Sequence, residues 1–164
     1  MRSHSARVKH WEFKLEGWRQ FRDAKPNVDH RALAELDRRG QLQSLVTQNI
    51  DGLHQLADHP LERVVELYGT HRLVECLSCL QTFEPDPVFD TFERFHQPPV
   101  WNCGGCLKPA TGSFGQPMPA EKTRLALELA AQADLLYSIG STLEIEPPVL
   151  VPRVTKFSGA FTFS

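Results

Sequence analysis

The four cysteines of the chain form two pairs whose spacing is typical of zinc ligands. Each pair has the pattern Cys-x-x-Cys, and 23 residues lie between the pairs. Two such turns can supply the four thiolates that surround Zn²⁺ tetrahedrally, at about 2.3 Å per Zn–S bond. Because four protein ligands leave no open position for water, the metal would stabilise the fold and do no chemistry. The ligands that we predict are Cys76, Cys79, Cys103 and Cys106.

Two disulfides, or buried thiols without a metal, are the alternatives to this zinc site. Thiols stay reduced inside cells, and paired cysteines there favour metal binding. Gly104 and Gly105 also favour a zinc knuckle, because a backbone that turns around a metal often needs a positive φ. The proline-rich residues 80–102 between the two pairs predict an irregular lobe around the ion.

Two short polar segments follow apolar segments that have the composition of strands. Ligands of α/β proteins collect beyond the carboxyl ends of parallel strands. Amide, carboxylate and hydroxyl groups there can fix hydrogen bonds to a ligand without competing as nucleophiles. Taken singly, each segment also has the composition of a solvated loop. The residues are Gln48, Asn49 and Asp51 after the strand predicted at 42–47, and Gly140, Ser141 and Thr142 after the strand predicted at 134–139.

Helices are predicted on either side of these strands. Asp29 suits the N-cap of a helix that ends at Arg39, because Gly40 can take the left-handed position after it. Another helix is predicted over residues 119–133, with a proline near its first turn. The first 25 residues predict an amphipathic helix that buries an aromatic face, formed by Trp11, Phe13, Trp18 and Phe21.

Strands that end in polar turns and alternate with helices predict an α/β fold, with a parallel sheet that a zinc lobe interrupts. The sequence contains no Gly-x-Gly-x-x-Gly motif and no P-loop, so the ordinary nucleotide-binding signatures are absent. The identity of the ligand at the two polar turns therefore depends on less common motifs.

The composition is that of an ordinary globular protein, since the 164 residues are 41% apolar and 23% charged. The net charge of −2 provides no field that would attract nucleic acid or acidic lipid, so we expect no direct nucleic acid binding and no membrane association. No apolar run approaches the roughly 18–20 residues that cross a bilayer, and no signal peptide is evident. We therefore expect a cytoplasmic protein.

The octapeptide Thr47–His54 resembles the signature of the sirtuins, the NAD-dependent protein deacylases. The resemblance covers roughly residues 27–152 and continues, in family order, through Glu66–Thr70, the cysteine pairs, Ser113–Gln116 and Ala133–Leu143. It implies a Rossmann-like parallel sheet with an inserted zinc-ribbon small domain. On this basis the partial NAD-binding domain comprises residues 1–70 and 107–164, and the ribbon comprises residues 71–106.

The resemblance also implies the reaction and the residues that serve it. In sirtuins the acyl oxygen of a modified lysine attacks C1′ of the nicotinamide ribose, and the products are nicotinamide, free lysine and acyl-ADP-ribose. The expected cofactors are NAD, as cosubstrate, and one structural zinc ion, and the expected partner is a protein with an acylated lysine. By motif position, Gln48 and Asn49 would hold the ribose and a water, Asp51 the nicotinamide carboxamide, and Gly140, Ser141 and Thr142 the phosphates and the adenosine ribose. Gly112, Phe114, Gly115 and Gln116 would bind the substrate.

Two residues depart from the sirtuin pattern. Tyr68 takes the place of the histidine that acts as general base. A phenol with a reference pKa near 10 is almost fully protonated at neutral pH, so we expect deacylation to be slower by about 10²–10⁴. We do not expect His71, at the start of the ribbon lobe, to replace this base. Gly112 replaces a branched apolar residue and predicts a wider lysine channel.

The Gly-Ala-Gly loop that opens the sirtuin fold, and a later strand with adenine contacts, have no match in the sequence. We therefore expect an incomplete sirtuin fold, truncated at both ends, with unpaired sheet edges. Two other functions remain as alternatives. One is a non-catalytic binder of NAD or acylated peptide, or a relative that transfers ADP-ribose. The other is a zinc-ribbon interaction module, although the ribbon contains no cluster of Lys and Arg.

Overall fold

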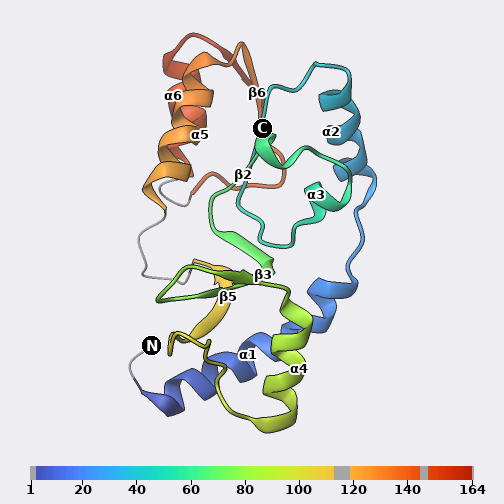
Figure 1. The fold of residues 1–164 in the computed structure, drawn as a ribbon. Coiled ribbons are helices and arrows are strands. Elements are labelled where there is room, and N and C mark those ends of the chain that lie inside the picture. Colours follow the sequence, from blue (N-terminus) through green and yellow to red (C-terminus); the bar gives the residue numbers. More distant parts are fainter. Residues whose placement is uncertain (1–2, 113–118, 145–147, 164) are drawn as a thin grey trace. The chain divides into compact units, whose positions relative to one another are not determined.

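The computed structural model describes residues 3–112, 119–144 and 148–163, and its chain forms two compact units (Figure 1). Unit 1 comprises Met1–Lys25, Ile50–Leu53 and Gly69–Gly112, and unit 2 comprises Pro26–Asn49, His54–Tyr68 and Ser113–Ser164. The first 25 residues thus belong to the unit that contains the cysteines. The division predicted from the sequence placed them with the other unit instead.

Unit 1 is built on a three-stranded antiparallel sheet in the order β4-β3-β5. The strands are β3 (Gly69–Cys76), β4 (Thr82–Phe83) and β5 (Leu107–Thr111). Cys76 pairs with Leu107 in the register of β3 and β5. Because one cysteine pair begins at the end of β3 and the other ends just before β5, this register brings both pairs to the same end of the sheet.

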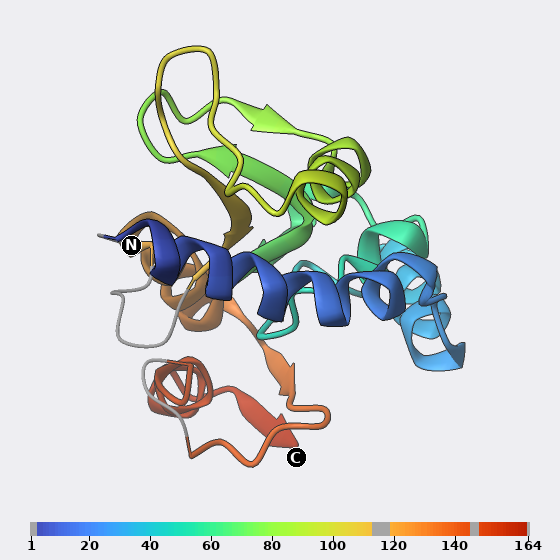
Figure 2. The same ribbon diagram turned by 90° about the horizontal axis from the view of Figure 1, so that it is seen from below.

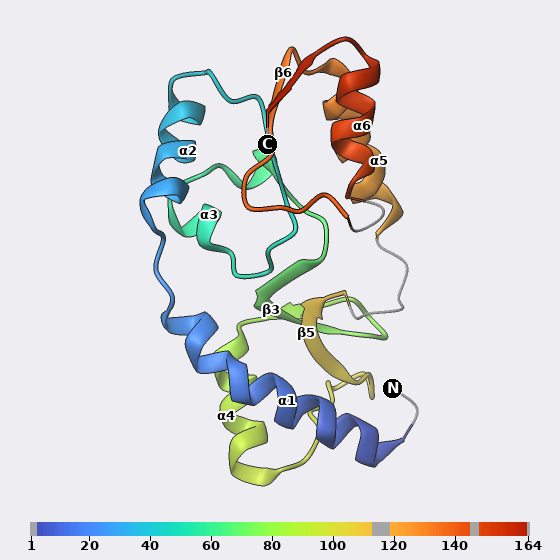
Figure 3. The ribbon, with the colours of Figure 1, turned by 180° about the vertical axis from the view of Figure 1, so that it is seen from behind.

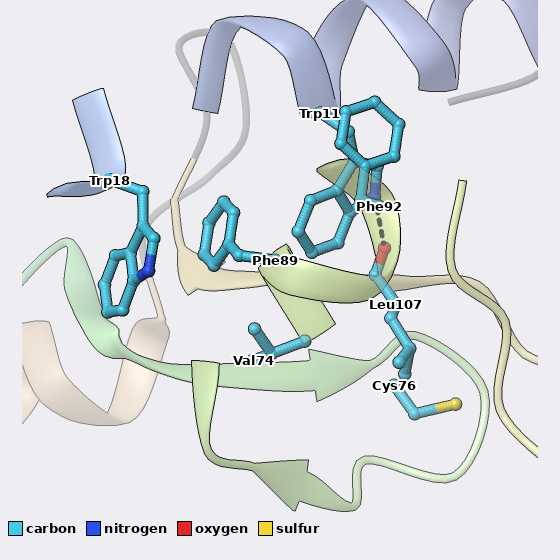
Figure 4. Close-up of a cluster of buried hydrophobic side chains, with 7 residues drawn as sticks. All are labelled: Trp11, Trp18, Val74, Cys76, Phe89, Phe92 and Leu107. Atoms are coloured by element: carbon cyan, nitrogen blue, oxygen red, sulfur yellow. Dashed lines mark hydrogen bonds between the residues drawn. The ribbon is translucent and has the colours of Figure 1, made fainter. Parts of the chain in front are cut away.

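Two helices, α1 (His4–Asp23) and α4 (Pro85–Phe95), pack on this sheet and enclose an aromatic core (Figures 2 and 4). Trp18 and Phe89 stack with their ring centroids 4.7 Å apart, and Trp11 meets Phe89 edge-on at 5.1 Å. The indole N–H of Trp11 donates a hydrogen bond of 3.2 Å to the carbonyl of Leu107 (Figure 4). Burial of these large rings gives the small unit a hydrophobic core of its own.

The prediction of an irregular lobe over residues 80–102 was wrong, because α4 lies within it. Pro85 is the first helical residue, where a fixed φ and a missing N–H are tolerated. Phe89 and Phe92 then follow at a spacing of three, so both face the core. The prolines that indicated irregular structure instead begin a helix.

The predicted N-terminal helix is confirmed as α1, but its aromatic face is narrower than expected. Trp11 and Trp18 are buried and Phe21 packs against the core, whereas Phe13 is 70% exposed. Positions 11 and 18 are seven residues apart and share a face, and position 13 points away from it.

Unit 2 contains helices and two parallel strand pairs. The first pair is β1 (Leu45–Thr47) and β2 (Val64–Glu66), with Val46 opposite Val65. The second is β6 (Leu135–Tyr137) and β7 (Phe161–Phe163), with Leu136 opposite Thr162. The helical segments are α2 (Val28–Arg38), α3 (Leu53–Leu56, whose first residue belongs to unit 1), η1 (Leu61–Arg63), α5 (Ala120–Gln132) and α6 (Leu150–Phe157).

The parallel pairs and the helices around them confirm the predicted α/β class. Helices α5 and α6 lie side by side (Figure 3), and Ala126 of α5 packs with Val65 and Leu67 in a second core. The strands predicted at 42–47 and 134–139 are shorter in the structure, at Leu45–Thr47 and Leu135–Tyr137. Asn27 rather than Asp29 is the N-cap of α2, since the Asn27 side chain accepts a hydrogen bond from the N–H of His30. Position 29 lies in the first turn, where a carboxylate is also favoured.

The second strand pair exposes large apolar side chains. These are Leu135, Tyr137, Ile139 next to β6, Phe161 and Phe163. In the residues that the structure describes, no helix combines the length and the apolar character needed to span a membrane.

Candidate functional site

The two polar turns predicted to bind a ligand meet in unit 2. The side-chain amide of Gln48, directly after β1, donates a hydrogen bond of 3.2 Å to Oγ of Ser141, which follows β6. The same Oγ accepts a bond of 3.2 Å from the backbone N–H of Leu143. Gly140 has a φ of +65°, which a glycine adopts without strain. Residues 93 positions apart are therefore brought together at the carboxyl ends of two strands.

The first turn is also fixed from within. The hydroxyl of Thr47 accepts a hydrogen bond of 3.0 Å from the N–H of Asn49, and its carbonyl accepts one of 3.0 Å from Leu67. Thr47 is buried, whereas Asn49 is exposed and Gln48 is half-buried. Buried Thr47 thus fixes the turn from which the amide side chains of Gln48 and Asn49 extend. In the second turn, Thr142 is exposed.

Asp51 belongs to unit 1, so the octapeptide passes from one unit to the other. Its Oδ1 accepts a hydrogen bond of 2.9 Å from the N–H of Leu53, and its carbonyl accepts one of 2.8 Å from Nε of Arg72. Gly52 between them is buried and has a φ of +67°. No sequence pattern singled out Arg72. The one signal that could have indicated such a contact is the glycine, which permits a close approach.

Tyr68 is half-buried and is the last residue of the unit 2 segment His54–Tyr68, two residues after β2. His71 lies in β3 of unit 1, where its ring stacks on Phe21 with the centroids 4.6 Å apart. Its Nε2 is 3.3 Å from Nζ of Lys14. Burial, followed by the charges of Lys14 and His10, lowers the pKa of His71 to about 4. A buried imidazole with so low a pKa is a poor proton acceptor, which supports the expectation that His71 does not replace the missing base.

Three of the four cysteines converge in unit 1. The sulfur atoms of Cys76, Cys79 and Cys103 all lie within 4.8 Å of one another, and those of Cys76 and Cys103 are 3.5 Å apart. Sulfur atoms on a tetrahedron with Zn–S bonds of about 2.3 Å would be about 3.8 Å apart. A soft donor set at this spacing fits Zn²⁺. Cys106, half-buried, is not in this group of described ligand atoms.

Backbone N–H groups form hydrogen bonds with two of these sulfur atoms. The N–H groups of Cys79 and then Ser78, despite the opposing effect of burial, lower the pKa of Cys76 to about 7. The N–H of Gly105 also favours the thiolate of Cys103, but the hydrogen bond with Cys76 and desolvation outweigh it and raise the pKa of Cys103. A Cβ at position 105 would collide with Sγ of Cys76 and lie 2.8 Å from Ser78. Glycine is thus required where the second knuckle passes the sulfur.

Of the residues predicted to bind the substrate, the structure describes only Gly112, which directly follows β5. Gly112 is exposed, and the residue before it, Thr111, is buried and pairs with Gly69 of β3. Phe114, Gly115 and Gln116 lie outside the described residues.

Comparison with known proteins adds to this geometry. The model of the Sir2 family matches residues 1–147. An NAD-dependent protein deacetylase of Sulfurisphaera tokodaii is 41% identical over 149 residues, which are 91% of this chain and 58% of that protein. The chain therefore spans less than two thirds of the length of this relative.

Solved structures agree with the sequence comparison. A Sir2 protein with a p53 peptide and NAD⁺ has a TM-score of 0.88 and 31% identity, over 96% of this chain and 65% of the other. A histidine-to-tyrosine mutant of Sir2 with a p53 peptide and NAD also has a TM-score of 0.88, with 32% identity over 96% and 66% of the two chains.

Proposed function

The chain belongs to the Sir2 family, and we propose that it carries the nicotinamide-ribose side of an NAD-dependent protein-lysine deacetylase. The observation that carries this proposal is the hydrogen bond of 3.2 Å between Gln48 and Ser141. It joins the two turns that the family resemblance assigns to NAD. A ligand that spans ribose and phosphate would touch both turns at once.

The side chains of the first turn suit the ribose. NAD, when bound, would supply the ribose carbon that takes up the acyl oxygen. Gln48 and Asn49 would hold ribose hydroxyls and a water by hydrogen bonds, and Asp51 would accept a bond from the nicotinamide carboxamide. Fixed polar groups of this kind can stabilise charge that develops as a bond to the ribose breaks.

The second turn suits the phosphates and the adenosine ribose. Gly140 leaves the backbone open to close approach, and Ser141 and Thr142 offer hydroxyl groups. The acylated peptide would run along the segment that begins at Gly112 and includes Phe114–Gln116, as an added strand. The p53 peptide in the similar Sir2 structures supports a protein substrate.

The cysteine lobe would hold one structural zinc ion. We assign all four cysteines to it, with Cys106 completing the set formed by Cys76, Cys79 and Cys103. The ion would fix the end of the sheet β4-β3-β5 and take no part in proton transfer.

A second function, NAD binding without efficient turnover, is favoured by Tyr68. A phenol in place of imidazole removes a general base, which contributes about 10²–10⁴ to a rate. A Sir2 mutant with tyrosine in place of a histidine, whose structure contains NAD and a p53 peptide, supports NAD binding by a sirtuin that has lost a histidine in this way.

Incubation of the purified chain with labelled NAD and an acetylated peptide tests both functions. Deacetylated peptide and released nicotinamide support the deacetylase. Binding of NAD without either product supports the binder, and label fixed on protein would indicate ADP-ribosyl transfer instead. The Gln48→Ala variant should lose NAD affinity, and Gln132→Ala, an exposed glutamine at the end of α5, is the matched control. Equal affinity of both variants would contradict the proposed site.

A further inference from the structure

Arg72 joins three segments of unit 1 through its guanidinium group. Nε donates to the carbonyl of Asp51 at 2.8 Å. The two terminal nitrogens donate to the last turn of α1, with Nη2 2.8 Å from the carbonyl of Phe21 and Nη1 3.1 Å from that of Arg22. One half-buried side chain of β3 thus connects the end of a helix to the loop that carries Asp51.

The helix end explains why an arginine is needed. The last carbonyls of a helix have no intrahelical donor, and a cation is favoured at this negative end. The carbonyls of Phe21 and Arg22 belong to this last turn of α1, which ends at Asp23. The planar fork of a guanidinium can satisfy two such carbonyls and still present Nε to a third acceptor, which a lysine ammonium cannot do with the same geometry.

The side chain of Arg72 packs closely against Gly52 in the loop that carries Asp51. A Cβ at Gly52 would lie 2.6 Å from Cγ of Arg72, so the stem of the arginine fills the space where a side chain at position 52 would stand. The neighbouring residue adds a second anchor, since the N–H of His71 donates to the carbonyl of Ile50 at 2.7 Å. Two successive residues of β3 therefore hold two successive carbonyls of the loop.

The loop in turn fixes the carboxylate. Oδ1 of Asp51 accepts the N–H of Leu53 at 2.9 Å, and this bond depends on the backbone path through Gly52. The path is set by the Arg72 stem on one side and by the Nε bond at the Asp51 carbonyl. A change at Arg72 would therefore move the carboxylate without removing it.

We propose that Arg72 is a positioning residue for Asp51 and thereby sets the affinity for the nicotinamide end of NAD. This inference rests on the proposed function, which assigns the carboxamide to Asp51. ADP-ribose contains every part of NAD except nicotinamide. The ratio of the two affinities therefore isolates the effect on Asp51 from effects on the rest of the binding site.

The test is calorimetric titration of the purified chain with NAD and with ADP-ribose. Arg72→Gln should lower the affinity for NAD by about 10-fold, roughly the effect of losing one hydrogen bond to a charged group. It should change the affinity for ADP-ribose by less than about 2-fold. Arg72→Lys keeps the positive charge and one donor nitrogen. Its affinity for NAD should lie between that of the parent and that of Arg72→Gln. Arg19→Gln, an exposed residue of α1 that pairs with Glu93, is the control and should change neither affinity. An unchanged ratio in both Arg72 variants, whether both affinities fall or neither does, would overturn the proposal.

Hydrogen exchange gives a second measurement that does not need NAD. The N–H of Leu53 should exchange about 10-fold faster in Arg72→Gln than in the parent and at the parental rate in Arg19→Gln. Equal exchange in all three chains would overturn the positioning role. If the parent bound neither ligand, the proposed function would fail, while exchange at Leu53 would still decide whether Arg72 holds the loop. If Arg72→Gln does not fold, Arg72→Lys decides by the same two measurements.

Discussion

The sulfur atoms of Cys76 and Cys103 lie 3.5 Å apart, although the residues are 27 positions apart in the chain. The sulfur of Cys79 lies within 4.8 Å of both, and three sulfur ligands at this spacing fit Zn²⁺, so we expect one zinc ion per chain by elemental analysis of the folded protein. Removal of the ion by a chelator should unfold unit 1, with loss of near-ultraviolet signal from its buried tryptophans.

Cys76→Ser should abolish stoichiometric zinc, and Cys106→Ser tests the fourth ligand. Thr91→Ala, an exposed change on α4 in the same unit, should retain the ion. Full zinc content in Cys76→Ser would contradict the site. Full content in Cys106→Ser alone would limit the ligand set to the three thiols that the structure brings together.

Tyr68→His should restore a general base. We expect nicotinamide release in the presence of an acetylated peptide to rise by about 10²–10⁴. Tyr137→His is the matched control, because it makes the same change at the other tyrosine, which is 65% exposed on β6. No gain at position 68 would show that the missing base is not what limits the reaction.

The bond between Gln48 and Ser141 should contribute to the stability of unit 2. A double-mutant cycle of Gln48→Ala and Ser141→Ala, measured by urea denaturation, should give a coupling free energy of about 0.5–1.5 kcal/mol. The same cycle with Ser158→Ala in place of Ser141→Ala should give a coupling near zero, because the Ser158 hydroxyl donates to the carbonyl of Val154 at the end of α6. Equal coupling in the two cycles would mean that the turns do not meet in solution.

Trp11→Ala should destabilise unit 1 by about 3–5 kcal/mol, because it removes a fully buried ring and its hydrogen bond to Leu107. Phe13→Ala removes a ring of the same helix that is 70% exposed, and it should change the free energy of unfolding by less than about 0.5 kcal/mol. Denaturant unfolding of the two variants checks the difference. Comparable losses would mean that the aromatic face of α1 is assigned incorrectly.

His71 should make the protein labile to mild acid. Burial, with Lys14 and His10, lowers its pKa in the folded state to about 4, against about 6.5 when it is unfolded. Between these two pH values the unfolded chain binds more protons than the folded chain. The contribution of neutral His71 to the free energy of unfolding is therefore fully present above pH 6.5. It is lost as the pH falls toward 4, by at most about 3 kcal/mol.

His71→Phe should flatten this pH dependence of unfolding, while His4→Phe, at an exposed histidine, should leave it unchanged. Loss of zinc in acid affects all three chains alike, so the difference between them isolates His71. If the free energy of unfolding of His71→Phe depended on pH as it does in the parent, His71 would not be the source of the acid sensitivity.

The sequence by itself determined which residue types are available for chemistry in this protein. The two cysteine pairs indicated a metal site because few other functions need that spacing. The polar residues after predicted strands indicated a ligand site, since parallel strands gather their carboxyl ends. The length and composition of α5 were enough to predict a helix, whose bounds differ by one residue at each end.

Pro85 and Pro87 led to the wrong prediction of an irregular lobe. A proline disrupts a helix interior but is favoured at a helix start, and the local sequence does not distinguish these two cases. The core in which Phe89 and Phe92 are buried decides for a helix. The packing of α1 with the cysteine lobe, and the role that we propose for Arg72, also depended on tertiary structure. A guanidinium can bind any carbonyl within its reach, and nothing local in the sequence states that residues 21, 22 and 51 will be the ones that surround residue 72. Local patterns thus set the residue types available for chemistry, and the non-local packing of side chains decided which of them meet.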